Sequence, residues 1–322
     1  MTLGKKHPGL WAILGLGSIG SLWAGRFLDK NIPVELLFKN QTRLEAIKNN
    51  GLTIHQDKES VTHHPEDLHT CDSPGAPIHN LIITTKAQQT LPALHTLAHR
   101  INTNTTLILL QNGMGVAQEI QKQLPHNPLF LGITTEGAYR TAPHTVVYAG
   151  KGDTWVGSAN MQKLAALHTL QAINQHCFWD ENIHPRLWQK FAINCAINGL
   201  TVLFQCKNGE LLQNKQACEQ MAKICLEIEN VLNKKGIQLS ESLLKTASNI
   251  AERTSDNYSS MLQDFRAQRD LELDYLNAYL CREAARLNVE TPHNQALVES
   301  IKQLTEARRS ESTKLTNKPP FT

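Results

Sequence analysis

The sequence predicts an α/β protein in two parts, an N-terminal parallel sheet flanked by helices and a C-terminal region that is all helical. Three observations support this prediction. Strand and helix signals alternate through the first half of the chain, helical periodicity dominates after Trp179, and a glycine-rich turn joins the first strand to the first helix. A chain of 322 residues also exceeds what one hydrophobic core usually supports, so we expect two domains.

The glycine-rich turn follows a short apolar run at residues 10–14 and precedes an amphipathic stretch that reaches about residue 30. The motif G-x-G-x-x-G is specific for dinucleotide binding only in this strand–turn–helix context. Its first glycine permits a tight turn, its second lets the backbone approach a pyrophosphate, and its third lets the helix pack on the strand. The helix N-terminus then stabilises the anion. The motif predicts a Rossmann-like dinucleotide-binding domain, with cofactor contacts from Gly15, Leu16, Gly17, Ser18, Ile19 and Gly20.

The end of the second strand indicates which dinucleotide is bound. This strand, residues 33–38, is followed by Lys39, and no carboxylate stands there to accept ribose hydroxyls. Glu35 lies too early, in mid-strand. Lys39 and Arg43 together suit a 2′-phosphate, although both could be ordinary solvated loop charges. The pattern favours NADP over NAD.

Two further strands end in polar residues. Residues 78–85 form a strand that ends before Lys86, and residues 105–111 form one that ends before Asn112. Ligands of an open parallel sheet bind outside the carboxyl ends of its strands, so both side chains are candidates to face the cofactor, or else simple turn residues. We also expect helices at 88–100 and from Gly115 to about 124, and strands at 129–135, 145–149 and 154–157.

The second half of the chain is predicted to be helical. We place the domain boundary near Asn182, giving a dinucleotide-binding domain at 1–182 and a helical substrate and catalytic domain at 183–322. Helices are expected at 185–204, 221–233, 241–253, 270–287 and 294–306. The last 16 residues, from Ala307, are polar, contain a Pro-Pro pair and are expected to fray.

A polar stripe on the first of these helices is the most informative feature of the chain. Lys190, Asn194 and Asn198 recur every four residues on an otherwise apolar segment and therefore share one helix face. Two amides in a packed interior would each leave unpaired groups costing about 1–3 kcal/mol, unless something polar meets them. Either the stripe faces a polar ligand in a cleft, or the asparagines tie neighbouring backbone together while the lysine snorkels out.

Composition excludes several classes of protein. A net charge of +3 implies no broad nucleic-acid surface, and no apolar run approaches the roughly 18 residues of a membrane span. Seven cysteines, an odd number without a C-x-x-C pair, indicate a reducing compartment, hence the cytoplasm. Fourteen histidines show no metal-ligand spacing, so no metal is expected.

Four stretches, in the expected order and spanning essentially the whole chain, resemble the ketopantoate reductase (2-dehydropantoate 2-reductase) family. They are the N-terminal glycine motif, the Asn112-Gly113-Met114-Gly115 turn, the segment from Leu187 through Lys190 and Asn194 to Asn198, and Ser259-Ser260-Met261-Leu262-Gln263-Asp264 with Glu272-Leu273-Asp274-Tyr275. By composition alone, the last stretch would be a loop entering a charged, solvated helix.

The resemblance implies NADPH-dependent reduction of ketopantoate to pantoate, a step of pantothenate and coenzyme A biosynthesis. Lys190 is similar to the family's catalytic lysine and Glu272 to its catalytic glutamate. Asn112, Asn194, Asn198 and Ser260 match substrate positions, and Lys86 matches a cofactor position. Many relatives have arginine where this sequence has Lys39. Lysine offers the 2′-phosphate a point charge, whereas the planar guanidinium of arginine can bind it through two hydrogen bonds. A monomer or a homodimer fits the family equally.

The implied chemistry is a hydride transfer that builds negative charge on the ketone oxygen. The ammonium of Lys190 would stabilise this oxygen and donate a proton, and Asn112 would orient the lysine or the nicotinamide. Glu272 would accept a hydrogen bond from the terminal hydroxyl of the substrate. Two alternatives stay open: a reductase of another branched 2-keto acid, and a non-catalytic NADP-binding sensor, which the intact Lys190 and Glu272 disfavour.

Overall fold

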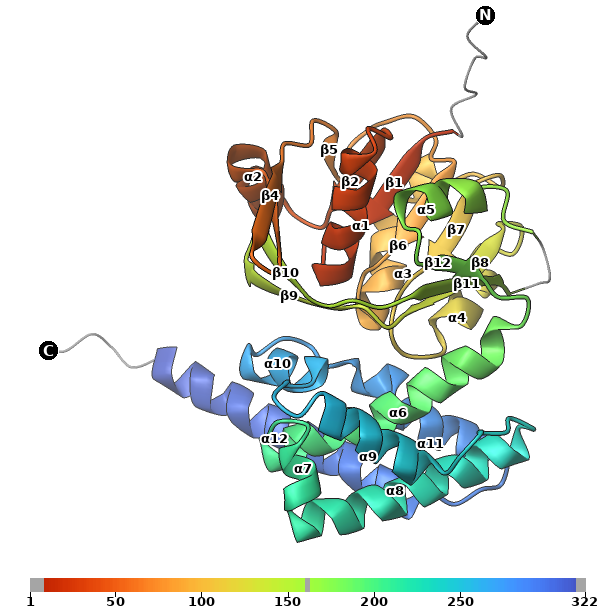
Figure 1. Cartoon of the computed structure of the whole chain (residues 1–322), viewed down its shortest axis with the longest axis vertical. Helices are drawn as coiled ribbons and strands as arrows, with labels where there is room; N and C mark the ends of the chain where they lie inside the picture. The colour runs from red at the N-terminus through yellow and green to blue at the C-terminus, as the bar shows by residue number, and fades with distance from the viewer. Residues whose placement is uncertain (1–8, 160–162, 317–322) are drawn as a thin grey trace, which may run out of the picture. The chain divides into compact units, whose positions relative to one another are not determined.

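The computed structural model describes residues 9–159 and 163–316, with side chains to residue 310, and divides the chain into two compact units. The first spans Met1–Ile183 and the second His184–Thr322. Figure 1 draws the first from red to green and the second from green to blue. No helix in the described ranges is both long enough and apolar enough to cross a membrane.

The first unit is built on an eight-stranded sheet of order β12-β11-β8-β7-β6-β1-β2-β5. All neighbours pair in parallel except β11, which runs antiparallel to β8. The chain therefore leaves β1 in one direction through β2 and β5, and then returns to the other side of β1 with β6. The strands are β1 Trp11–Leu14, β2 Val34–Phe38, β5 Leu68–Thr70, β6 Asn80–Ile83, β7 Thr106–Leu109, β8 Leu129–Thr134, β11 Thr154–Ser158 and β12 Cys177–Trp179.

The central strands are continuous apolar runs because both faces of the sheet are covered. Every residue of β1, β2 and β6 is buried, the pattern of a parallel sheet with helices on each side. The helices of this unit are α1 Ser18–Asp29, α2 Gln41–Asn50, α3 Ala87–Thr96, α4 Val116–Gln123 and α5 Leu167–Ile173, with a short 3-10 turn η1 at Ala98–Arg100. The α/β fold predicted from the alternating signals is thus confirmed.

A second sheet of four strands, not predicted from the sequence, packs against α1 in the order β4-β3-β10-β9. It contains β3 Leu52–Gln56, β4 Glu59–His63, β9 Gly137–Ala142 and β10 Thr145–Gly150. Buried Glu136, just before β9, pairs with Arg26 of α1 and accepts a hydrogen bond from Tyr148 Oη at 2.7 Å. This ion pair joins helix and sheet, and its charged hydrogen bonds hold the pKa of Glu136 low despite burial.

The second unit is all helical, as predicted. Its elements are α6 Ile183–Phe204, α7 Glu210–Gln213, α8 Lys215–Lys234, α9 Leu243–Arg253, α10 Ser260–Arg266, the 3-10 turn η2 Glu272–Tyr275, α11 Asn277–Arg286 and α12 Pro292–Thr316.

Two helix predictions in this unit are wrong. The expected helix 270–287 is broken at Leu276, whose φ of −118° and ψ of −112° separate η2 from α11. Leu273 and Leu276 are buried here, so packing of these side chains overrides the helical periodicity. The chain from Ala307 to Thr316 is helical and not frayed. In this part of α12, Arg309 pairs with Asp270 at 2.7 Å on the surface. The Pro-Pro pair lies outside the described residues.

Candidate functional site

The first unit carries a glycine-rich turn at the point where the strand order reverses. Because β1 lies between β2 and β6, the turns after β1 and after β6 sit at a topological switch point, where open α/β sheets bind ligands. Gly15 has a φ of +94°, which a side chain would strain. A Cβ on Gly20 would collide with the Gly15 carbonyl oxygen, so this glycine allows α1 to pack on the turn.

Gly17 differs from Gly15 and Gly20 because none of the described residues crowds it. The nearest atom to a Cβ built there is the Thr84 carbonyl oxygen at 3.8 Å, which is ordinary contact. Gly17 is also the N-cap of α1, and no side chain caps this helix end. The first N–H groups of a helix lack intrahelical partners, so these donors and the open backbone fit a pyrophosphate. The pyrophosphate of a dinucleotide such as NADP therefore fits the residues present.

A chain of threonines and a glutamine links the turns after β6 and β7. Thr90 Oγ1 lies 2.7 Å from Gln111 Oε1 and 2.8 Å from Thr85 Oγ1, and the Thr84 N–H donates to the Leu14 carbonyl at 2.9 Å. Gln111 Nε2 is buried and finds no acceptor among the described residues. Sequence reasoning missed Thr84 and Gln111, although both are polar residues at strand ends, the same signal that selected Lys86 and Asn112.

Lys86 and Asn112 lie at the predicted strand ends. Lys86 is the N-cap residue of α3, directly after the turn that follows β6, and Asn112 lies in the turn between β7 and α4. Both are half-buried. Because β6 and β7 are adjacent parallel strands, their carboxyl ends open on the same edge of the sheet as the glycine turn after β1.

The three charged residues of the second strand and its turn have different surroundings. Lys39 is exposed directly after β2. Arg43 Nε donates to the Pro143 carbonyl at 3.1 Å, and burial together with the neighbouring Arg140 lowers the pKa of Arg43. Glu35 is buried, and its Oε2 accepts from Arg100 Nη2 at 2.6 Å. No carboxylate among these residues is available for a ribose, and Lys39 is the exposed cation.

The polar stripe of the second unit lies on α6 as predicted. Phe191, Ala192 and Cys195 are buried between its members, whereas Lys190 and Asn194 are half-buried. Asn198 retains 8% exposure, and within the described part of the chain neither asparagine side chain has a hydrogen bond. The alternative that these amides tie neighbouring backbone together therefore gains no support, and both remain able to meet a ligand.

Lys190 and Glu272 form an electrostatically coupled pair. Burial lowers the pKa of the Lys190 ammonium to about 8, and the Glu272 carboxylate opposes this by raising it. Glu272 is the first residue of η2 and is half-buried. Arg269, the other cation near it in sequence, donates from Nε to Asp264 Oδ1 at 2.8 Å. The lysine is thus an ammonium near its point of titration, suited to donating a proton at neutral pH.

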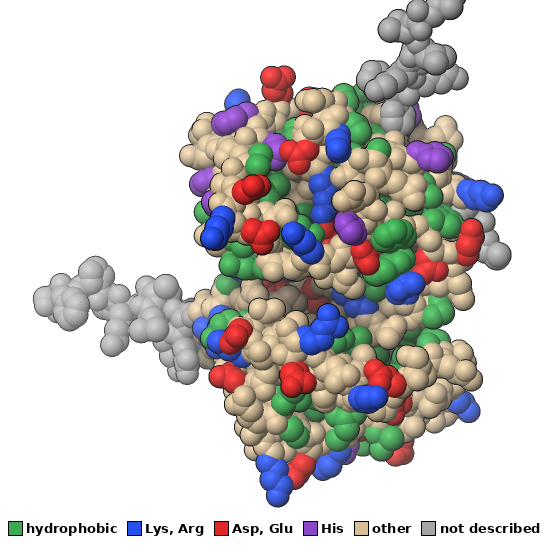
Figure 2. Space-filling view, in the orientation of Figure 1, with side chains coloured by type: hydrophobic (Ala, Val, Ile, Leu, Met, Phe, Trp, Pro, Cys, Tyr) green, Lys and Arg blue, Asp and Glu red, His purple; other side chains and the backbone are tan. Residues whose placement is uncertain are grey.

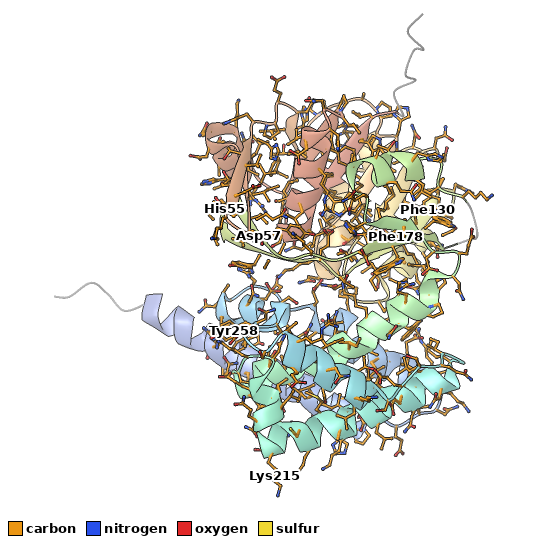
Figure 3. The ribbon with its side chains drawn as sticks, in the orientation of Figure 1. His55, Asp57, Phe130, Phe178, Lys215 and Tyr258 are labelled. Carbon is orange, nitrogen blue, oxygen red and sulfur yellow. The ribbon has the colours of Figure 1, made fainter. Side chains whose placement is uncertain are left out.

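Adjacent serines at the start of α10 have different roles. Ser259 is buried and caps the helix, with Oγ accepting from the Leu262 N–H at 3.1 Å and lying 2.6 Å from Thr201 Oγ1 of α6. Ser260 is exposed, and its hydroxyl is not needed for the cap. Figure 3 labels Tyr258, the exposed residue just before this pair. The structure leaves Ser260 as the serine that can meet a ligand.

A metal-binding cluster was also sought among the described residues. No group of three or more His, Cys, Asp or Glu residues in the described ranges is placed to hold a metal ion. Figure 2 shows Lys, Arg, Asp and Glu side chains interspersed over the visible faces of the two units.

Comparisons with known proteins agree with this arrangement. The family profile described as "Ketopantoate reductase PanE/ApbA" matches residues 11–161, and that described as "Ketopantoate reductase PanE/ApbA C terminal" matches residues 182–305. The 2-dehydropantoate 2-reductase of Shigella flexneri is 32% identical over 300 residues, covering 90% of this chain and 93% of its own. That of Pyrococcus horikoshii is 31% identical over 295 residues, covering 90% and 95%.

Solved structures share the fold. A D-mandelate dehydrogenase in ternary complex with NADH and anilino(oxo)acetate superposes with a TM-score of 0.86 at 24% identity, covering 92% of this chain and 99% of its own. A PanE/ApbA family ketopantoate reductase from Ralstonia eutropha superposes with a TM-score of 0.84 at 20% identity, covering 93% and 99%.

Proposed function

This chain belongs to the ketopantoate reductase family, and on that premise we propose that it reduces 2-dehydropantoate to pantoate with NADPH, a step of pantothenate and coenzyme A biosynthesis. Family membership confirms the resemblance inferred from the four sequence stretches and the prediction of an oxidoreductase. The observation that carries the proposal is the polar stripe on α6, where Lys190 lies one and two turns from Asn194 and Asn198, amides without hydrogen bonds in the described part of the chain. Burial also lowers the pKa of Lys190, to about 8.

In the proposed reaction, residues of the second unit bind the keto acid and protonate it. NADPH, when bound, supplies the hydride that reaches the 2-keto carbon. Lys190 Nζ donates its proton to the ketone oxygen as negative charge develops there, which both neutralises and stabilises this oxygen. Glu272 accepts a hydrogen bond from the terminal hydroxyl, and Asn194, Asn198 and Ser260 supply neutral donors to the carboxylate and hydroxyl of the substrate.

The first unit is proposed to hold the cofactor. Lys39 binds the 2′-phosphate, Lys86 and Asn112 contact the nicotinamide half, and Asn112 also reaches the substrate. The glycine turn Gly15-Leu16-Gly17-Ser18-Ile19-Gly20 binds the pyrophosphate, which the open backbone at Gly17 supports. We accordingly assign cofactor binding to residues 1–182 and catalysis to residues 183–322.

The thiols support a proposal for the cellular compartment. All seven cysteines are free, and burial raises the pKa of Cys177 and Cys225 to about 12, so these thiols stay protonated. Such thiols suit a reducing compartment, and we propose the cytoplasm. The partner we propose is the small-molecule substrate ketopantoate, bound by a monomer or a homodimer.

A substrate panel tests the function. NADPH oxidation should be followed with purified protein and ketopantoate, 2-ketoisovalerate or phenylglyoxylate, with the product identified by chromatography. Ketopantoate should give the highest kcat/KM and pantoate as product. A higher kcat/KM for either other keto acid would replace the proposal with a related reductase, and no turnover of any of them, with NADPH still bound, would indicate a sensor.

A further inference from the structure

A buried asparagine outside the proposed site connects its two main elements. Asn277, the first residue of α11, is completely buried, and its Nδ2 lies 2.9 Å from the Cys195 carbonyl oxygen of α6 and 2.9 Å from Asn294 Oδ1 of α12. Cys195 stands directly after Asn194 in the polar stripe. One amide group therefore contacts the backbone of the helix that carries Lys190, Asn194 and Asn198.

The orientation of this amide is determined by its neighbours. Asn294 Nδ2 donates to Glu227 Oε2 of α8 at 2.7 Å, and the same carboxylate accepts from the Asn294 and His293 N–H groups. With its NH₂ group directed at Glu227, Asn294 turns its Oδ1 toward Asn277. Asn277 must therefore donate from Nδ2 to Asn294 Oδ1, and the second hydrogen of Nδ2 is donated to the Cys195 carbonyl. No apolar side chain can make these two bonds.

Asn277 is also rigidly joined to the turn that carries Glu272. Between them lie Leu273 and Leu276, both buried, and the Leu276 N–H donates to the Leu273 carbonyl at 3.2 Å. Arg282 of α11 donates from Nη2 to the Asp274 carbonyl of η2 at 2.6 Å. The turn η2 and the start of α11 thus form one packed piece, and Asn277 is the point at which it is hydrogen-bonded to α6.

We propose that Asn277 is a positioning residue that fixes the turn carrying Glu272 against the helix carrying Lys190, and thereby sets the interaction between the carboxylate and the ammonium. Asn277 Oδ1 is buried and accepts no hydrogen bond within the described ranges, so the amide is retained there at a cost in stability. The two hydrogen bonds that Asn277 donates, which join α11 to α6 and to α12, offset the free energy lost by leaving Oδ1 without a donor. The inference deepens the proposed function, which uses Lys190 and Glu272, but the test below measures only the electrostatic interaction of these two residues and does not depend on that function.

The chain offers a matched control on the same helix. Thr201 of α6 is also completely buried and lies 2.6 Å from Ser259 Oγ of α10, so it connects α6 to the segment of Ser260 and not to that of Glu272. Thr201→Val keeps the shape and removes this contact, together with the hydrogen bond that Thr201 Oγ1 donates to the Asn198 carbonyl within α6 at 2.8 Å. It should cost stability as Asn277→Leu does, but it leaves the connection between α6 and η2 in place.

The experiment measures the pKa of Lys190 directly, without activity. Lysines of the full-length protein are reductively methylated with ¹³C-formaldehyde, the Lys190 resonance is identified by its loss in Lys190→Arg, and it is titrated by NMR. The effect of Glu272→Gln on the pKa of Lys190 is measured with Asn277 present and with Asn277→Leu. The Glu272 carboxylate raises the pKa of Lys190. A nearby opposite charge typically shifts a pKa by about 1–3 pH units, so the effect is resolvable.

In the parent, Glu272→Gln should lower the pKa of Lys190. With Asn277→Leu this shift should shrink to less than about half, whereas with Thr201→Val it should keep its full size. If Asn277→Leu does not fold, Asn277→Ser, which is too short to make both bonds, is measured in its place and should give the same reduction. An equal shift in the Asn277 variant and the parent would overturn the proposal, as would an equal loss in Thr201→Val. Neither result depends on which keto acid the protein reduces.

Discussion

The activity of the protein should fall as the pH rises through about 8, because Lys190 donates a proton only while it is protonated and its pKa is about 8. An ordinary lysine titrates near 10.4, and at about pH 9.5 it would still be roughly 90% protonated. A lysine with a pKa of about 8 is only about 3% protonated there, so kcat/KM should be about thirtyfold below its plateau.

The assay is the pH dependence of kcat/KM for ketopantoate at saturating NADPH and constant ionic strength. Glu272→Gln should move the alkaline limb to lower pH, because the carboxylate that raises the pKa of Lys190 is gone. Lys190→Ala should lower kcat by about 10²–10⁴-fold with NADPH affinity little changed. A parent profile that stays flat to about pH 9.5, or a Lys190→Ala variant within tenfold of the parent, would refute the assignment of Lys190 as proton donor.

Three further predictions concern the first unit. Lys39→Ala should raise KM for NADPH while leaving NADH kinetics nearly unchanged, and similar kcat/KM for the two cofactors in the parent would contradict this. The Gly17→Ala variant should keep the Tm of the parent but bind NADPH more weakly, whereas Gly20→Ala should lower the Tm because its Cβ would collide with the Gly15 carbonyl oxygen. Scanning calorimetry measures the Tm, and titration with NADPH measures the affinity. Glu136→Ala should lower the free energy of unfolding by about 3–5 kcal/mol in urea, with exposed Glu66→Ala as control. Because the pKa of Glu136 is lowered, its contribution to the free energy of unfolding is complete above the ordinary glutamate pKa and is lost as the pH falls through the pKa of the folded protein. An equal loss of stability in Glu136→Ala at acid and at neutral pH would contradict this.

Patterns within short stretches of the sequence were sufficient to predict the glycine turn after β1 and the polar face of α6. The turn Gly15–Gly20 and the apolar run before it predicted the strand–turn–helix element that opens the first sheet. The four-residue spacing of Lys190, Asn194 and Asn198 predicted the polar face of α6. Both signals arise from residues near one another in the chain, so periodicity and turn chemistry are enough to read them.

Features that depend on distant residues were not predicted. The four-stranded sheet pairs β3 with β10 across ninety or so residues, and half-exposed strands such as β4 and β9 lack an apolar pattern. The break at Leu276 results from packing of its own side chain in the second unit. Asn277 looked like an ordinary helical residue because its partners, Cys195 and Asn294, are far away in sequence.

Substrate recognition through Glu272 tests the central claim most directly. The measurement is kcat/KM for ketopantoate and for 2-ketoisovalerate, which lacks the hydroxymethyl group, in the parent and in Glu272→Ala. A buried acceptor built for a hydroxyl disfavours an analogue without one, because its own polar group is left unpaired. The parent should strongly prefer ketopantoate, and Glu272→Ala should reduce that preference mainly by damaging ketopantoate turnover. An unchanged ratio, with both substrates slowed alike, would remove Glu272 from the substrate site and contradict the account.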